Sequence, residues 1–130
     1  MPRPKSDTPT ERELDILNIL WESGPSTARD VHTQLSSRQK VAYNSVLTIL
    51  SIMLDKGYVR RDESRKSHVY EAVFARAEVQ DNMLTGFMDR VFGGSALNLV
   101  NRALEVKGAS QEDKDKIAAL LKAMEDDAAS

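Results

Sequence analysis

The side chains best suited to chemistry in this sequence form one polar stripe near the middle of the chain. Asn44, Thr48 and Ser51 recur at intervals of three and four residues, which places them on one face of a helix. Asparagine can pair with the edge of adenine through two hydrogen bonds, and threonine can offer its methyl group to thymine. Ser45 and Leu47 lie at the margins of the same face. The stripe therefore predicts a set of side chains that contact base edges.

Basic and hydroxyl side chains flank this stripe and suit phosphate oxygens. Such side chains supply the sequence-independent part of DNA binding, and the free amides at a helix start also attract phosphate. Between positions 38 and 66 there are seven Lys and Arg residues and three Asp and Glu residues, although the whole chain carries a net charge of −2. The candidate phosphate contacts are Ser26, Thr27, Arg29, Arg38, Lys40, Arg60, Arg65 and Lys66.

Other kinds of site find little support. The chain has no cysteine, which excludes disulfides, thiolate metal ligands and cysteine nucleophiles. His32 and His68 are far apart and lack a carboxylate cluster, so we expect each to be structural or solvated. Neither a glycine-rich phosphate loop nor a nucleophile elbow is present. We therefore expect no enzyme activity, no metal and no cofactor.

A helix within residues 38–57 must carry the base-contacting stripe. It has an apolar face opposite the stripe, and Gly57 stands where a left-handed cap ends a helix. Lys56 suits the negative end of the helix dipole. The apolar face consists of Val46, Ile49, Leu50 and Met53.

Two shorter helices are predicted before this one. The segment from Thr8 to Glu11 fits a capping box with proline at the first helical position, so a helix should begin there and stop near Ser23-Gly24-Pro25. Ser26 or Thr27 should cap a second helix that ends near Leu35. The expected buried residues are Leu14, Leu17, Leu20 and Trp21 in the first helix and Ala28, Val31 and Leu35 in the second.

After the third helix, the apolar period changes from helical to alternating. Residues 58–61 and 68–73 predict two short strands joined by the charged loop 62–67, with Arg65 and Lys66 at the hairpin tip. Three helices followed by a basic hairpin is the order of a winged helix-turn-helix. In that fold the third helix enters the major groove and the hairpin, or wing, contacts the DNA backbone.

The second half of the chain differs in charge and pattern. From residue 77 onward there are ten acidic and six basic residues, whereas residues 1–76 carry a net charge of +2. Helices are expected over 78–92 and 95–106 and again after Ser110, with a break at Gly93-Gly94. Their apolar stripes exceed what short helices can bury alone, so we expect a homodimer, with a monomeric helical subdomain as the alternative. The expected dimer contacts are Val79, Met83, Leu84, Phe87, Met88, Val91, Phe92, Leu97, Val100, Leu104, Ile117, Leu120, Leu121 and Met124.

These patterns predict a mainly α-helical protein with a small β-hairpin. Residues 8–75 should form a winged helix-turn-helix domain, and residues 76–127 a helical dimerisation arm. The short tail before Thr8 is expected to be disordered, with Arg3 and Lys5 as a weak phosphate-seeking arm. No long apolar run or secretion signal is present, so we expect a cytoplasmic protein without membrane contact.

The ordered set of motifs resembles a known family. The strings LDILNILWESGPSTARDVHTQL and VAYNSVLTILSIMLDKGYV, the charged hairpin, and FMDRVFGG followed by LNLVN are similar to the penicillinase-repressor family, the BlaI/MecI/CopY group of bacterial transcription regulators. The resemblance covers roughly residues 10–124. It implies a homodimeric repressor whose winged helix binds a palindromic double-stranded DNA operator and whose C-terminal helices form the dimer.

The chain departs from that family at two places. Family members often carry arginine where this chain has Leu47 and Ile52, which favours contacts with thymine methyl groups over contacts with guanine. Antibiotic-responsive members are inactivated by cleavage of an Asn-Phe bond after the Gly-Gly break, and the matching pair here is Asn101-Arg102. The resemblance thus makes a regulatory protease a candidate partner, while Arg102 favours a different protease or a different signal.

Two other readings remain open on the sequence alone. One is a winged-helix protein-interaction module without specific DNA binding, which the apolar Leu47 and Ile52 allow. The other is a small-molecule sensor with its pocket among the C-terminal helices. The salt dependence of the binding affinity distinguishes the first reading from a repressor, because DNA binding weakens steeply with salt and an apolar protein contact does not.

Overall fold

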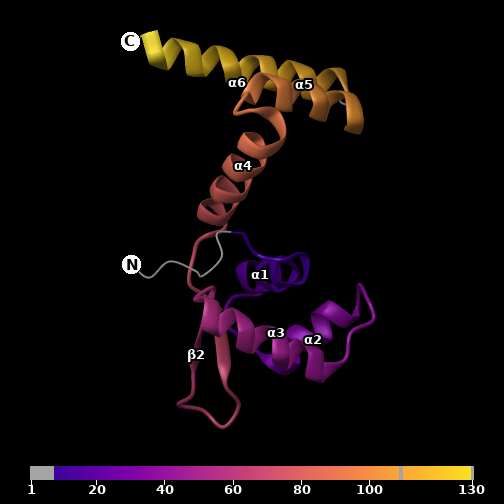
Figure 1. The fold of residues 1–130 in the computed structure, drawn as a ribbon, viewed down its shortest axis with the longest axis vertical. Helices are drawn as coiled ribbons and strands as arrows, with labels where there is room; N and C mark the ends of the chain where they lie inside the picture. Colours follow the sequence, from indigo (N-terminus) through magenta and orange to yellow (C-terminus); the bar gives the residue numbers. More distant parts are fainter. Residues whose placement is uncertain (1–7, 109, 130) are drawn as a thin grey trace. The chain divides into compact units, whose positions relative to one another are not determined.

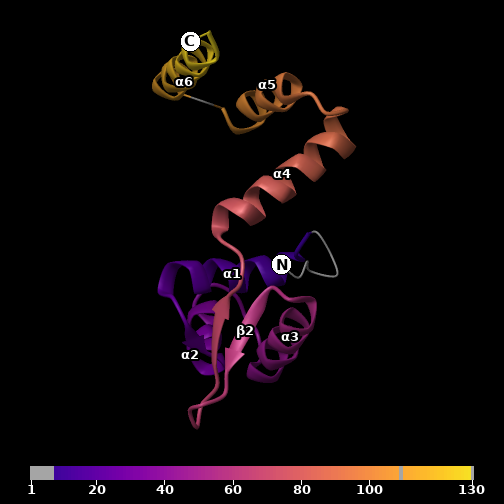
Figure 2. The ribbon, with the colours of Figure 1, turned by 90° about the vertical axis from the view of Figure 1, so that its left-hand side faces the viewer.

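The computed structural model describes residues 8–108 and 110–129. These residues divide into two compact units between Thr85 and Gly86. The mainly helical fold with a small antiparallel sheet agrees with the sequence prediction, whereas the predicted tail arm with Arg3 and Lys5 lies outside the described residues. The elements are α1 (Glu11–Ser23), β1 (Ser26–Thr27), α2 (Ala28–Ser36), α3 (Tyr43–Lys56), β2 (Val59–Asp62), β3 (Val69–Ala72), α4 (Arg76–Phe92), α5 (Ala96–Lys107) and α6 (Gln111–Ala129) (Figures 1 and 2).

Helix α1 begins two residues later than the sequence pattern predicted. Its N-cap is Thr10, whose hydroxyl oxygen accepts a hydrogen bond from the Glu13 amide at 3.2 Å. The Glu13 carboxylate in turn accepts from the Thr10 amide at 2.8 Å, which completes a capping box. Pro9 precedes the cap and is buried. The spacing of Thr10 and Glu13 matches the capping-box motif, and Glu13 also pairs with Lys56 on α3.

Helix α2 begins at the predicted place, but one strand before it was missed. Thr27 is the N-cap and forms a reciprocal capping box with Asp30, so this predicted cap is confirmed. Ser26 and Thr27 also pair with Tyr70 and Val69 as a short strand. The sheet therefore has three antiparallel strands in the order β1-β3-β2, rather than the two of a simple hairpin. Two residues are too few to produce an alternating pattern that the sequence could reveal.

The core of the N-terminal unit lies where α1, α2 and α3 meet the base of the hairpin (Figure 2). The predicted inward faces of α2 and α3 are buried, except that Ile49 is only partly so. Trp21 is half-buried, and its indole N–H donates to the Phe74 carbonyl at 3.0 Å, which ties the end of α1 to the chain after β3. The buried core residues are Ile16, Leu17, Ile19, Leu20, Ala28, Val31, Leu35, Val46, Leu50, Met53, Tyr58, Val59 and Tyr70.

The C-terminal unit begins within α4 and contains the predicted helix break at Gly93-Gly94 and the predicted cap at Ser110, while Ser95, expected inside a helix, is the N-cap of α5. Gly93 and Gly94 have φ values of 58° and 83°, which suit the turn that ends α4. The hydroxyls of Ser95 and Ser110 accept from the amides three residues later and so begin α5 and α6. Within residues 8–108 and 110–129, no helix has the length and apolar character needed to cross a membrane.

Candidate nucleic-acid interface

Helix α3 presents the predicted polar stripe on its outer side. Asn44, Ser45, Thr48 and Ser51 are all exposed, while the opposite side is buried in the core. The Thr48 hydroxyl donates to the Asn44 carbonyl at 3.0 Å. That hydroxyl can therefore only accept from a base edge, and its methyl group is available for a thymine methyl. The face can offer one amide, two free hydroxyls and one methyl to a groove.

Leu47 and Ile52, the two apolar residues of α3 at positions where the resembled family often has arginine, differ in exposure. Leu47 is only partly exposed and packs against the core. Ile52 is 45% exposed on the outer side of the helix. Leu47 is therefore less available for a base contact than its sequence position suggested, and Ile52 is the more accessible of the two.

Ion pairing divides the basic side chains of the winged helix into two groups. Five of them pair with carboxylates: Arg38 and Arg76 with Glu22, Lys56 with Glu13, Arg60 with Glu71, and Arg61 with Glu63. Those without an ion pair to a described carboxylate are Arg12 on α1 together with Arg29, Lys40, Arg65 and Lys66. Among these, the charge of Arg65 still interacts with the Asp62 carboxylate. Apart from Arg12, these cations lie at the starts of α2 and α3 and at the tip of the wing.

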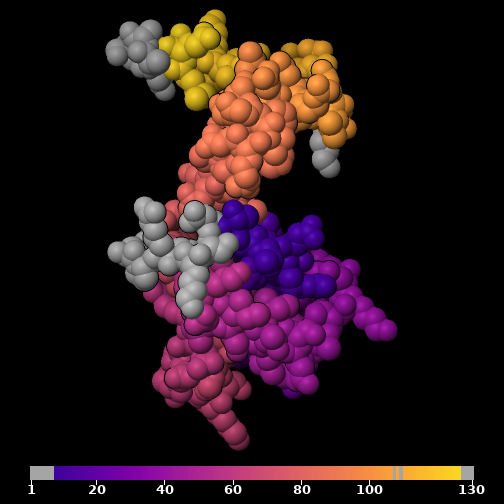
Figure 3. Space-filling view, in the orientation of Figure 1, coloured from indigo at the N-terminus to yellow at the C-terminus, as the bar shows by residue number. Residues whose placement is uncertain are grey.

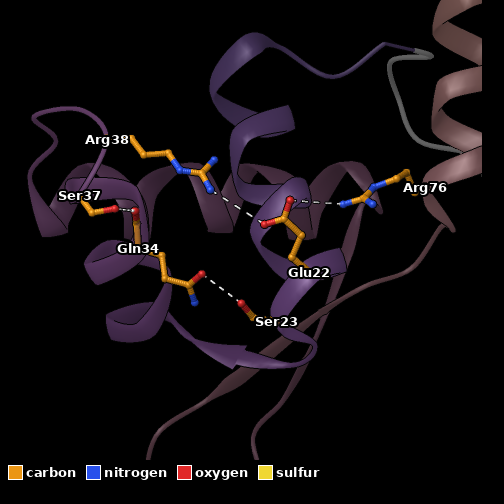
Figure 4. A network of polar contacts seen from close by, with 6 residues as sticks. All are labelled: Glu22, Ser23, Gln34, Ser37, Arg38 and Arg76. Carbon is orange, nitrogen blue, oxygen red and sulfur yellow. Dashed lines mark hydrogen bonds and ion pairs between the residues drawn. The ribbon is translucent and has the colours of Figure 1, made fainter.

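A polar network joins the ends of α1 and α2 (Figure 4). In this network Arg38 and Arg76 both pair with Glu22. The Glu22 carboxylate lies between Arg38, at 4.0 Å, and Arg76, at 3.7 Å. Ser23 donates to the Gln34 side chain at 3.0 Å, joining α1 to α2. Arg38 remains well exposed but shares its charge with Glu22, so it is a weaker candidate for a phosphate contact than Lys40.

The start of α2 departs from the predicted phosphate site at Ser26 and Thr27. Ser26 is buried, and its hydroxyl donates to the Gly24 carbonyl at 2.9 Å, so it has neither the exposure nor the free proton for a phosphate. Thr27 is engaged by Asp30, whose carboxylate accepts from the Thr27 amide at 3.2 Å. Arg29 is exposed and lies over the Tyr43 ring. Arg29 is therefore the phosphate candidate that remains at this helix start.

The wing is ordered by its own polar contacts. The Asp62 carboxylate accepts from the Ser64 amide at 2.9 Å, and hydrogen bonds from the Ser64 hydroxyl and amide hold the pKa of Asp62 below its ordinary value. Hydrogen bonds with Tyr70 and then Glu63 raise the pKa of Arg61 above its ordinary value. Arg65 and Lys66 are exposed in the loop between β2 and β3, where the charge of Arg65 also favours the ionised form of Asp62. The hairpin projects from the N-terminal unit at the foot of Figure 3, so these two charges can reach a ligand.

A shallow hollow of about 430 Å³ lies between the wing and the start of α2. Its walls carry charges of both signs, including Arg60, Arg65, Asp30 and Glu71. Arg60 pairs with Glu71, and Asp30 is used in the cap of α2. No group of three or more acidic or histidine side chains among the described residues is placed to hold a metal ion.

The C-terminal helices place most of the predicted dimer contacts at the surface, with one exception. Val79 is only 6% exposed and is buried within the N-terminal unit, so it has no surface to offer a second chain. Met83, Met88, Phe92, Val100, Leu104 and Ile117 are partly exposed. Asn101 and Arg102 are exposed on α5, where Arg102 pairs with Glu105 at 2.9 Å. The exposed apolar side chains of α4, α5 and α6 are Leu84, Phe87, Val91, Leu97, Val106, Leu120, Leu121 and Met124.

Sequence reasoning missed two features of this interface. One is the buried Glu13, although the capping-box spacing of Thr10 and Glu13 was present to indicate its role. The other is the contact of Arg29 and His32 with Tyr43, for which the sequence carried no signal because it joins different helices.

Known proteins with similar sequences or folds match between 59% and 93% of the chain. The Transcriptional regulator BlaI of Mycobacterium tuberculosis is 30% identical over 103 residues, covering 78% of this chain and 75% of that protein. A solved DNA-binding domain of the repressor BlaI has a similar fold over 59% of this chain and 90% of its own, with a TM-score of 0.50 and 17% identity. The structure of RosR from H. salinarum matches over 93% of this chain and 94% of its own, with a TM-score of 0.50 and 16% identity.

The chain also matches a family model over most of its length. The family model described as Penicillinase repressor matches residues 9–123, which include the three helices, the wing and most of the C-terminal unit. The fold likeness and the sequence match agree on a winged-helix regulator. The chain therefore belongs to the penicillinase repressor family and is a transcriptional regulator, not an enzyme.

Proposed function

We propose that this protein is a repressor that binds a palindromic double-stranded DNA operator as a homodimer. The observation that carries the proposal is the position of the unpaired cations. Arg29, Lys40, Arg65 and Lys66 lie at the starts of α2 and α3 and in the wing of the same unit and form no ion pair with a described carboxylate, whereas most other described basic side chains of that unit do. Free cations attract phosphate, so this distribution supports a DNA contact around α3 and the wing.

In this proposal α3 enters the major groove. Asn44 pairs with an adenine, Thr48 contacts a thymine methyl group, and Ser45 and Ser51 accept or donate at base edges. Leu47 keeps only a marginal role because it is partly buried. The wing tip contacts the DNA backbone through Arg65 and Lys66, as in other winged helices.

A homodimer follows from the apolar surface of the C-terminal helices. Large side chains such as Phe87, Leu97 and Leu120 remain about half or more exposed in one chain, and exposed apolar side chains that recur on three helices favour an interaction site. A second copy related by a two-fold axis would cover these side chains and present two copies of α3 to two half-sites. This geometry accounts for a palindromic operator.

Release of the operator is proposed to act through this dimer. A cut between Asn101 and Arg102 would separate the end of α5 and all of α6 from the rest of the chain. The bond lies inside a helix, so a protease must first open α5 locally. Because Arg102 stands where a phenylalanine occurs in the resembled repressors, control of the intact protein by another signal is favoured over cleavage by the same kind of protease.

Salt dependence of DNA binding tests the proposal. An operator is first selected from random duplexes with the full-length protein, and its dissociation constant is then measured by fluorescence anisotropy between about 50 and 200 mM salt. We expect log K to fall linearly with log salt, with a steep slope of several units. A protein-interaction module would yield no enriched duplex and no salt-dependent binding, which would overturn the proposal.

A pair of charge-matched variants locates the contact. Lys66→Ala should weaken binding to operator and random DNA by a similar factor and reduce the salt slope by about one. Lys122→Ala removes the same charge from α6 and should leave the slope unchanged. Equal salt slopes for the two variants would show that Lys66 in the wing does not contact a DNA phosphate.

A further inference from the structure

The start of α3 lacks the side-chain cap that begins α1, α2 and α5. Its N-cap residue is Ala42, which has no side chain able to accept a hydrogen bond from the helix amides. Tyr43, the first residue of the helix, instead contacts two side chains of α2. The first turn of α3 therefore lacks a side-chain cap of its own and is instead contacted by side chains of α2.

The contacts around Tyr43 join α2 to α3 through two aromatic interactions. The His32 ring meets the Tyr43 ring edge to face, with centroids 5.7 Å apart and an interplanar angle of 83°. The Arg29 guanidinium lies on the Tyr43 ring with its Cζ 4.9 Å from the centroid, within the range of a cation–π contact. Tyr43 thus has a histidine at one side and a guanidinium on its face.

The loop before α3 is held by both α2 and α1. His32 Nε2 lies 2.9 Å from the Val41 carbonyl oxygen, two residues before Tyr43. The Gln39 side-chain amide donates to Asp15 on α1 at 2.9 Å. These bonds restrain the chain between α2 and α3, so the position of the Tyr43 ring is determined before any ligand binds.

Arg29 gains a defined position from this arrangement. It is exposed and forms no ion pair with any described carboxylate, so its charge is available to a ligand while its side chain rests on the Tyr43 ring. A flexible arginine loses rotamer freedom when it binds a phosphate, and an aromatic support removes part of that cost in advance. Support of this kind benefits a phosphate contact that must be made in a fixed position relative to the base contacts of α3.

We infer that Tyr43 is a positioning residue for operator recognition, held by His32, which fixes the Arg29 guanidinium for a DNA phosphate beside the start of α3. This inference rests on the proposed function, because it names how one phosphate contact of that interface is aligned. It assigns no base contact to Tyr43. The effect of Tyr43 on DNA binding passes through Arg29.

A double-mutant cycle on the full-length protein tests this coupling. Tyr43→Leu should weaken operator binding by about two- to five-fold, the range expected for loss of an exposed cation–π contact. In an Arg29→Ala background, Tyr43→Leu should cause no further loss, because the side chain that it positions is gone. Tyr43→Phe keeps the ring and should restore wild-type affinity. A Tyr43→Leu effect of equal size in both backgrounds would overturn the inference.

Two further measurements keep the test independent of folding and of DNA binding itself. Arg29→Lys, an exposed change, keeps the charge but loses the planar contact and should reduce operator affinity, with the salt slope unchanged. In the DNA-free protein, the Arg29 side-chain protons should be shifted upfield by the Tyr43 ring current, and Tyr43→Leu should abolish that shift. Absence of the shift would overturn the inference alone, whereas absence of salt-dependent DNA binding by the wild type would overturn the proposed function as well.

Discussion

The ammonium nitrogen of Lys56, the last residue of α3, lies 3.0 Å from a carboxylate oxygen of Glu13 in the first turn of α1. The Glu13 side chain is almost fully buried, and its other oxygen also accepts from the Thr10 amide. One carboxylate therefore caps α1 and anchors the far end of α3. The base-contacting helix is held at its start by α2 and at its end by α1.

Replacing Lys56 with methionine should destabilise the N-terminal unit. The change leaves the buried Glu13 carboxylate without its cation, and such a loss costs several kcal/mol when both partners are fully buried. The Lys56 side chain is 22% exposed, so we expect a smaller loss of about 1–3 kcal/mol in the free energy of unfolding. Urea unfolding of Lys56→Met against Lys40→Met, an exposed lysine without a carboxylate partner, measures the difference. Equal stability of the two variants would contradict a role for the pair.

Asn44→Ala should reduce the preference for the operator over random DNA. Asn44 is exposed near the start of α3, and loss of one good base contact costs about 1–3 kcal/mol of discrimination. Binding to random DNA should change little, because the phosphate contacts remain. Competition titrations with both duplexes give the ratio. An equal loss on the two duplexes would show that Asn44 does not contact a base.

Acidification should loosen the turn of the wing. Hydrogen bonds from Ser64 hold the pKa of Asp62 below its ordinary value, so they stabilise the charged carboxylate. The stabilisation is present above the unfolded pKa of about 3.9 and is lost as pH falls through the lower folded pKa. The Ser64 amide resonance should therefore move with a midpoint below about pH 4. Asp62→Asn keeps an acceptor oxygen and should remove that titration; a transition that persists in this variant must come from another group.

Phe87→Asp should dissociate the dimer and leave the winged helix folded. Phe87 is 47% exposed in one chain, and a second copy that covers it would bury the new charge without a partner. Sedimentation velocity at micromolar concentration should show a monomer, with operator binding much weakened because the two half-sites are no longer linked. Asp81→Ala, a change at an exposed charged position earlier in α4, is the control. A wild-type protein that is monomeric under these conditions and still binds a palindrome tightly would contradict the proposal.

Truncation after Asn101 should reproduce the consequence of cleavage at that bond. The shortened chain lacks α6 with the exposed Leu120, Leu121 and Met124, and each such side chain contributes about 1.5–3 kcal/mol when fully buried. We expect weaker dimerisation and loss of operator affinity at cellular protein concentrations. Sedimentation and anisotropy on the fragment provide the measurement. Full-strength dimerisation and binding would eliminate cleavage here as an off-switch.

The sequence by itself determined the features that depend on neighbours along the chain. The periods of α1, α2 and α3, the stop at Gly57 and the caps at Thr27 and Ser110 all follow from spacings of three or four residues or from one backbone preference. The same local patterns predicted the exposed stripe on α3 and the charged hairpin. Family membership followed from the order of these motifs.

Only the tertiary structure decided which of the candidate side chains are available. Ser26 is a plausible surface cap until β1 pairs with β3 and buries it, and Val79 belongs to an apolar stripe of α4 but is only 6% exposed in the folded chain. Whether a cation is free depends on carboxylates that lie far away in sequence, as Lys56 and Glu13 are separated by 43 residues. Contacts of this kind, including Arg29 on Tyr43, are fixed by how the helices pack, and no spacing along the chain encodes them.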